Sequence, residues 1–275
     1  MIKTIYINFA DFWSGFNVHD NFFMNLLKEQ VNVVISNTPT YLFYSSYGDA
    51  HKSYSCKKIF YTGENRRPNF DECDYALTFD HLNEPRHYRL PLYVLYEGYS
   101  DITLPKQLNN ALANRKFCNF LVSNPGCQFR NDFFHKLNDY KPVDSGGSHM
   151  NTLGYTIGHG SNDKLKFQQQ YKFSIAFENS SFSGYVTEKI FEPMRAVSIP
   201  IYWGAQDVSE DFNPSSFINV HDFATVDDAI EYIKYIDTND EAYMKMLSEP
   251  WVLNNEAPCT NKLENIRKFL FSIID

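Results

Sequence analysis

The sequence has few cysteines, no excess of basic residues and no long apolar run. Its five cysteines, at positions 56, 73, 118, 127 and 259 of the 275-residue chain, include no Cys-x-x-Cys pair. This odd, scattered set argues against a disulfide framework or a zinc site and favours a reducing compartment. Lys and Arg number 25 against 33 Asp and Glu, a net charge of -8, so no general positive field is available to bind nucleic acid.

The chain also lacks the roughly 18 consecutive apolar residues that a membrane-spanning helix needs. Its first seven residues, Met1–Ile7, are typical of a β-strand and not of a secretory signal peptide. We therefore expect a cytoplasmic protein. The sequence leaves open whether the protein associates peripherally with a membrane and whether it forms oligomers.

Short apolar segments alternate with helical ones in two successive blocks, which predicts an α/β fold with mostly parallel sheets. Strands are expected at residues 4–9, 31–36, 40–47, 58–62, 75–79, 117–123, 173–177 and 199–203, with an extended segment at 89–95. Helices are expected at residues 21–29, 130–137, 226–236, 242–247 and 263–274. The polar stretch 97–110 divides the chain into two expected domains, residues 1–110 and 111–275.

The most informative stretch is residues 171–190, followed shortly by residues 198–204. It predicts a strand, a loop of small residues, a helix start and a second strand, and the N-terminus of such a helix can bind an anion. Thr187 is a suitable N-cap, so Lys189 and the first N–H groups of the helix are candidates for a diphosphate site. The alternative is an ordinary capped helix. Pro193 should disturb this helix after about a turn and a half.

Two further residues carry chemistry. Arg130 follows a strand and a Pro-Gly turn at a helix start, where its guanidinium can bind diphosphate oxygens in pairs; the alternative is a surface residue. Glu64 follows the strand that ends in Thr-Gly, at the sheet edge where ligands of open α/β sheets bind. It is the candidate general base, unless Arg66 or Arg67 simply pairs with it.

Three strings in the C-terminal half resemble the donor-binding signature of the α-1,3-fucosyltransferases, the bacterial type of glycosyltransferase family 10. They are Phe177-Glu-Asn-Ser180, Gly184-Tyr-Val-Thr-Glu-Lys-Ile190 and Ile199-Pro-Ile-Tyr-Trp-Gly204. The resemblance implies the GT-B architecture, in which two Rossmann-like domains face each other across a cleft. The N-terminal domain would receive an oligosaccharide acceptor and the C-terminal domain GDP-fucose, with the last helix, residues 263–274, crossing back to the first domain.

The resemblance also implies roles for single residues. Glu188 would accept hydrogen bonds from the ribose, Asn179 would lie near the donor sugar or ribose, and Tyr185 would line the fucose or nucleotide pocket. Family members share the Thr-Gly-Glu-Asn string, whose glutamate, Glu64 here, is the proposed base. Trp13 lies in a stretch similar to the family's N-terminal loop, where it either stacks on an acceptor sugar or packs in the core.

The resemblance implies inverting transfer of L-fucose from GDP-β-L-fucose to the 3-hydroxyl of GlcNAc in Galβ1-4GlcNAc, a Lewis X-type product. It leaves open an α-1,4 linkage or another acceptor, such as a reducing-end glucose. The alternatives are a GT-B enzyme for another nucleotide sugar, or a glycan- or nucleotide-binding relative without activity. The sequence contains no Asp-x-Asp, the metal–nucleotide motif of the other large glycosyltransferase architecture. We therefore expect no obligatory metal, while stimulation by Mn²⁺ or Mg²⁺ stays open.

Overall fold

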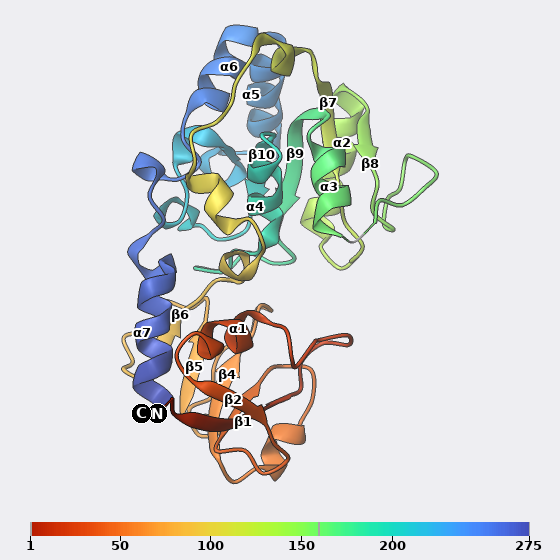
Figure 1. Ribbon diagram of the computed structural model, residues 1–275. Helices are drawn as coiled ribbons and strands as arrows, with labels where there is room; N and C mark the ends of the chain where they lie inside the picture. Colours follow the sequence, from red (N-terminus) through yellow and green to blue (C-terminus); the bar gives the residue numbers. More distant parts are fainter. Residues whose placement is uncertain (1, 159, 275) are drawn as a thin grey trace. The chain divides into compact units, whose positions relative to one another are not determined.

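The computed structural model describes residues 2–158 and 160–274 and divides the chain into two compact units (Figure 1). The first comprises Met1–Leu95 and Cys259–Asp275, and the second comprises Tyr96–Pro258. The first passage between the units therefore lies at residues 95 and 96, ahead of the division at residue 110 expected from the sequence. In the described residues, no helix has the length and apolarity to cross a bilayer.

The first unit contains a six-stranded sheet in which neighbouring strands are all parallel. The strands are β1 (Thr4–Ala10), β2 (Asn32–Ile35), β3 (Tyr41–Tyr44), β4 (Lys57–Tyr61), β5 (Tyr75–Thr78) and β6 (His87–Arg89), in the order β2-β1-β3-β4-β5-β6. Helices α1 (Phe22–Lys28) and α7 (Leu263–Ile274) belong to this unit.

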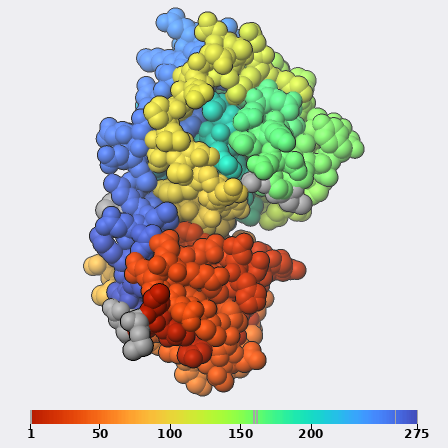
Figure 2. All heavy atoms as spheres, viewed as in Figure 1, coloured from red at the N-terminus to blue at the C-terminus, as the bar shows by residue number. Residues whose placement is uncertain are grey.

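Helix α7 returns to the beginning of the chain. The Lys3 ammonium donates a hydrogen bond to the carbonyl of Ile274 at 2.6 Å, and Arg267 pairs with Glu29 at 2.6 Å. The Phe269 ring packs against two tyrosines of β5 and β6. Figure 2 shows the blue side chains of this helix against the red ones of the first residues. The C-terminal segment thus completes the core of the first unit.

The second unit contains a five-stranded sheet, again with all neighbours parallel. Its strands are β7 (Lys116–Phe120), β8 (Val143–Ser145), β9 (Tyr171–Phe177), β10 (Ile199–Trp203) and β11 (Ile218–Asn219), in the order β11-β10-β9-β7-β8. Its helices are α2 (Gln128–Tyr140), α3 (Ser161–Gln168), α4 (Glu188–Arg195), α5 (Val226–Thr238) and α6 (Asp240–Ser248). All seven residues of β9 are buried, as expected of a central strand covered on both faces.

The strand order locates a ligand-binding edge in each sheet. Successive connections run to opposite sides between β1 and β3 in the first unit, and between β7 and β9 in the second. Loops that leave the carboxyl ends of strands at such a switch point diverge and leave a crevice, where ligands of this fold class bind. The loops after β1 and β3 and those after β7 and β9 therefore border the expected ligand sites, and the loops after the adjacent strands β4 and β8 lie beside them.

The sequence predictions fail where periodicity is weak. Residues 89–95 are not one extended segment: β6 ends at Arg89, and Leu92–Leu95 form a 3-10 turn after Pro91. Helix α3 was not anticipated because its sequence, SNDKLKFQ, has only two apolar residues. Pro193 lies inside α4, which ends two residues later at Arg195, as the sequence predicts.

Candidate active site

The second unit has a cavity of about 360 Å³ at the switch point of its sheet. Four structural pieces surround it: the loop after β7, the glycine-rich loop after β8, the end of β9, and the facing sides of α3 and α4. Its lining includes Leu121, Val122, Ser123, Asn124, Gly146, Gly147, Ser148, Thr156, Ile157, Gly158, Lys164, Asn179, Glu188 and Lys189. The volume falls within the range of small-molecule sites.

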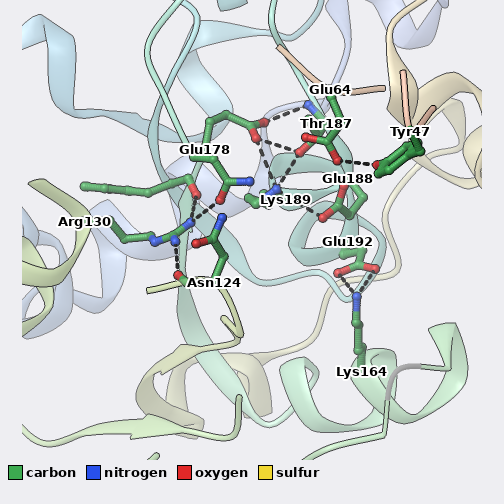
Figure 3. A network of polar contacts seen from close by, with 12 residues as sticks. Tyr47, Glu64, Asn124, Arg130, Lys164, Glu178, Thr187, Glu188, Lys189 and Glu192 are labelled. Carbon is green, nitrogen blue, oxygen red and sulfur yellow. Dashed lines mark hydrogen bonds and ion pairs between the residues drawn. The ribbon is translucent and has the colours of Figure 1, made fainter. Parts of the chain in front are cut away.

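Three of the residues expected to bind the donor line this cavity together. They are Asn179 after β9 and Glu188 and Lys189 in the first turn of α4. The Lys189 ammonium lies 3.3 Å from Glu178 Oε2 and 3.2 Å from Glu188 Oε1, and it donates a hydrogen bond to Thr187 Oγ1 at 3.0 Å (Figure 3). Burial alone would lower the pKa of Lys189, yet the two carboxylates raise it above its ordinary value. The cavity thus holds a permanent cation.

Glu178 is a residue whose part sequence reasoning missed. Its side chain is fully buried, and its two carboxylate oxygens accept hydrogen bonds from the N–H and the hydroxyl of Thr187, both at 2.7 Å. Thr187 is the N-cap of α4 as expected, but its side chain makes no capping bond. Glu178 therefore satisfies the helix terminus from outside the helix, and burial raises its pKa. A glutamate that directly follows a largely apolar strand was the available signal.

Lys164 of α3 is a second cation that the sequence analysis did not select. Its ammonium bridges both carboxylate oxygens of Glu192, at 2.9 and 3.2 Å, and its side chain lines the cavity beside Lys189. Burial raises the pKa of Glu192. Burial would also raise the pKa of Glu188, but Lys189 and Lys164 together hold it below its ordinary value. At neutral pH Glu188, in the first turn of α4, is therefore ionised between Lys189 of α4 and Lys164 of α3.

Arg130 has a different setting from the one expected. Its side chain is 0% exposed, and its guanidinium donates hydrogen bonds to the Asn124 carbonyl at 2.6 Å, Asn179 Oδ1 at 3.0 Å and the Phe177 carbonyl at 3.3 Å. It lies beside a smaller void of about 40 Å³ that also borders Lys164. In this conformation Arg130 fixes two cavity-lining asparagines and does not itself line the larger cavity. Burial lowers its pKa.

Tyr185 is likewise buried, with 2% exposure, and is not part of the cavity lining. The glycine-rich loop after β8 is packed tightly enough to explain its composition: a Cβ on Gly147 would lie 1.9 Å from the Val122 carbonyl oxygen. Asn151 closes this loop by donating hydrogen bonds to the carbonyls of Gly147 and Tyr155 at 2.7 and 2.9 Å. The glycines thus let the backbone of this loop pack closely against the loop after β7.

Glu64 lies in the first unit, in the turn after β4, and is exposed. The Tyr47 hydroxyl donates a hydrogen bond to its Oε1 at 2.8 Å (Figure 3). The arginine pairing considered for Glu64 is not formed by Arg67, which instead lies 2.8 Å from Asp80. Trp13, after β1, is 42% exposed and packs edge-on against the Tyr47 ring. Polar and aromatic groups therefore gather at the carboxyl edge of this sheet as well.

A metal site would need several ligating side chains close together. Within residues 2–158 and 160–274, no group of three His, Cys, Asp or Glu side chains is placed to hold a metal ion. The groups that carry positive charge in the cavity of the second unit are Lys189 and Lys164.

Comparison with known proteins extends over both units. Residues 7–96 match the model of the α-(1,3)-fucosyltransferase FucT N-terminal domain, and residues 112–264 match that of the glycosyltransferase family 10 (fucosyltransferase) C-terminal domain. The chain is 39% identical to α-(1,3)-fucosyltransferase FucT of Helicobacter pylori, over 82% of this chain and 55% of that protein. The chain therefore spans about half the length of this curated relative.

Solved structures agree with the sequence comparison. A crystal structure of an α1,3-fucosyltransferase matches with a TM-score of 0.86 and 34% identity, over 99% of this chain and 90% of that one. A structure of α1,3-fucosyltransferase with GDP-fucose matches with a TM-score of 0.85 and 33% identity, over 100% and 91% of the two chains. The predicted α/β fold of the GT-B class, with two Rossmann-like domains, is confirmed. The chain belongs to glycosyltransferase family 10, the fucosyltransferase family whose model matches its second unit.

Proposed function

We propose that this protein transfers L-fucose from GDP-β-L-fucose to a glycan hydroxyl with inversion, and that the hydroxyl is the 3-OH of GlcNAc in Galβ1-4GlcNAc. The observation that carries the proposal is the charged start of α4, where Lys189 and Glu188 line a cavity at the switch point of the sheet. The similarity to an α1,3-fucosyltransferase with GDP-fucose supports the choice of donor.

The leaving diphosphate needs positive charge that is already in place. Lys189 supplies it, and the N-terminal end of α4 adds a partial positive charge that favours an anion by about 0.3–1 kcal/mol when exposed. Lys164 lines the same cavity and can add a second full charge when it leaves Glu192. Arg130 supports the site from behind by fixing Asn124 and Asn179. Diphosphate binding by the arginine itself would need a rotation of its side chain out of these bonds.

The nucleoside and the sugar need hydrogen-bonding groups more than charge. Glu188 stays ionised beside the lysines, so its carboxylate can accept hydrogen bonds from ribose hydroxyls. The Asn179 amide, with its oxygen fixed by Arg130 at 3.0 Å, presents its nitrogen as a donor. Tyr185 is buried and does not line the cavity, so its contribution in this conformation is to packing.

Glu64 is the base in this proposal. Its carboxylate takes the proton of the acceptor hydroxyl as that oxygen forms a bond to the anomeric carbon of fucose. The bond between this carbon and the diphosphate oxygen breaks on the opposite face, and GDP leaves with the electron pair. Glu64 is suited to the role because it is exposed at the carboxyl edge of the sheet and is held by a neutral donor, Tyr47, instead of by Arg67.

The test follows transfer and binding separately. The protein is incubated with GDP-fucose and N-acetyllactosamine, with and without Mn²⁺, and GDP release is measured beside the mass of the product. A gain of one fucose supports the proposal. GDP release without product would mean that the donor is right and the acceptor is wrong. GDP binding without release would favour another donor sugar or a relative without activity.

Two variants assign the residues. Glu64→Gln should abolish transfer while the affinity for GDP stays that of the parent, whereas the matched surface variant Glu84→Gln should retain both. Lys189→Ala should weaken GDP binding by on the order of 10- to 100-fold, since a charged hydrogen bond contributes about 1.5–3 kcal/mol. Full transfer by Glu64→Gln would remove this residue from the role of base.

A further inference from the structure

The loop after β3 is hydrogen-bonded to the turn that carries Glu64. The Tyr47 hydroxyl donates to Glu64 Oε1 at 2.8 Å. One residue earlier, the hydroxyls of Ser46 and Thr62 lie 3.2 Å apart, and the Glu64 N–H donates to Thr62 Oγ1 at 3.0 Å. The first two contacts join two loops that follow neighbouring strands, and the third is a local bond within the turn of Glu64. The position of the Glu64 carboxylate therefore depends on the loop that carries Tyr47.

That loop is in turn held by Asp11, the first residue after β1. The Asp11 carboxylate accepts hydrogen bonds from the N–H groups of Ala50 and His51, both at 2.9 Å, and lies 2.6 Å from His51 Nδ1. The carbonyl of Asp11 accepts a bond from the Tyr47 N–H at 3.0 Å. Both side chains of the Asp11–His51 pair are buried, with 5% and 6% exposure. Gly48 leaves no space there, since a Cβ would lie 2.5 Å from Asp11 Oδ1.

An exposed carboxylate in a turn has several rotamers, and a base must meet its proton at hydrogen-bond distance. A hydroxyl donor that occupies Oε1 selects one rotamer of Glu64 and leaves Oε2 to accept the proton. Burial and the bond to Glu64 raise the pKa of Tyr47, while Arg66 opposes the shift. Tyr47 therefore remains a protonated donor throughout the pH range in which the enzyme works.

We propose that Tyr47 is a positioning residue for the base: it fixes the Glu64 carboxylate through its hydroxyl and is itself fixed by the buried Asp11–His51 pair. The proposal rests on the proposed function, in which Glu64 removes the acceptor proton. It adds that the geometry of this step is set by the loop after β3, at the switch point of the first sheet.

The test is Tyr47→Phe, which keeps the ring and removes only the hydroxyl. We expect kcat to fall on the order of 10-fold and the KM for GDP-fucose to stay unchanged, because the donor is bound elsewhere. The matched control is Tyr6→Phe, another half-exposed tyrosine of the same unit, which should leave kcat as in the parent.

A double-variant cycle separates this inference from the proposed function. In the Glu64→Gln background, adding Tyr47→Phe should have no further effect on the residual rate, because the interaction is already lost. If Glu64→Gln abolishes transfer but Tyr47→Phe has the parent's kcat, the positioning role is wrong and the base assignment stands. If Glu64→Gln transfers fucose at the parent's rate, the proposed base is wrong and the positioning role falls with it.

Discussion

Removing the charge of Lys164 should change both the stability of the protein and its nucleotide binding, and the change in stability should depend on pH. In Lys164→Met the side chain keeps an unbranched apolar stem, and Glu192 loses the ammonium that bridges both its oxygens at 2.9 and 3.2 Å. The Glu192 side chain is 13% exposed and Glu188 repels it from the same helix. The buried carboxylate then keeps only the weaker effect of Lys189 to offset its burial, and its protonated form becomes favoured.

The loss of stability in Lys164→Met has an upper bound, because the Glu192 carboxylate can always take up a proton. The ordinary pKa of Glu192 is 4.5, and each pH unit above it adds about 1.36 kcal/mol to the free energy of keeping the carboxyl protonated. At pH 7 this cost is about 3.4 kcal/mol. Burial already raises this pKa in the parent, so part of the cost is present before the substitution. We expect Lys164→Met to lower the free energy of unfolding by about 2 kcal/mol at pH 7.

The direction of the pKa shift of Glu192 determines how the loss of stability changes with pH. A carboxyl whose pKa is raised in the folded protein favours folding below its unfolded pKa and loses that contribution as the pH rises. The difference between parent and Lys164→Met should therefore be small near pH 4.5 and grow toward pH 7. Urea unfolding at several pH values measures it, with the free energy of unfolding obtained by linear extrapolation.

The double variant Lys164→Met with Glu192→Gln separates the two effects. It should recover the stability of the parent, because no unpaired carboxylate remains, but not the affinity for GDP, because the second cation is still missing. A stability loss in Lys164→Met that is equal at pH 5 and pH 7 would refute the electrostatic reasoning. Recovery of GDP affinity in the double variant would show that Lys164 acts only through its structural partner.

Three further substitutions test the framework of the cavity. Gly147→Ala should destabilise the protein by more than about 2 kcal/mol and lower the melting temperature, since its Cβ would lie 1.9 Å from the Val122 carbonyl oxygen and backbone atoms cannot give way. Arg130→Lys should cost about 2–4 kcal/mol in urea unfolding, because a lysine cannot satisfy three acceptors that a guanidinium reaches. Thr187→Val should cost about 1–2 kcal/mol, also by urea unfolding, because Glu178 loses a buried donor at 2.7 Å.

Matched controls make these outcomes decisive. Gly154→Ala probes a glycine at φ +76° with open space around it, so its cost should stay near the 1–2 kcal/mol of a left-handed backbone. Equal losses for Gly147→Ala and Gly154→Ala would contradict the steric argument. Arg130→Lys with the stability of the parent would mean that the arginine is free to serve a ligand. A neutral Thr187→Val would mean that the helix N-terminus does not depend on Glu178.

The sequence predicts most of the fold because its signals are local. The strand Ile199–Trp203 and the helix Leu263–Ile274 have the predicted bounds, since one is a continuous apolar run and the other a regular apolar stripe. Strand β8, with three residues, and β11, with two, are too short to give such a signal. Helix α3 escapes for the complementary reason: it is mostly polar.

The site is predicted unevenly, and burial explains the difference. Asn179, Glu188 and Lys189 line one cavity as a string of neighbours can be expected to do. Arg130 and Tyr185 are buried and do not line it, because a one-dimensional pattern does not state which way a side chain points. Lys164 reaches the cavity from a separate helix, so only the folded chain brings it beside Lys189.

The return of α7 to the first unit has a consequence for the order of synthesis. The second unit, Tyr96–Pro258, is a continuous stretch, whereas the first is built from two segments that flank it. A ribosome would therefore release the whole second unit before the synthesis of the helix whose Ile274 carbonyl accepts a hydrogen bond from Lys3. Until then the sheet that carries Glu64 lacks part of its core, so the second unit should mature first and the first unit last.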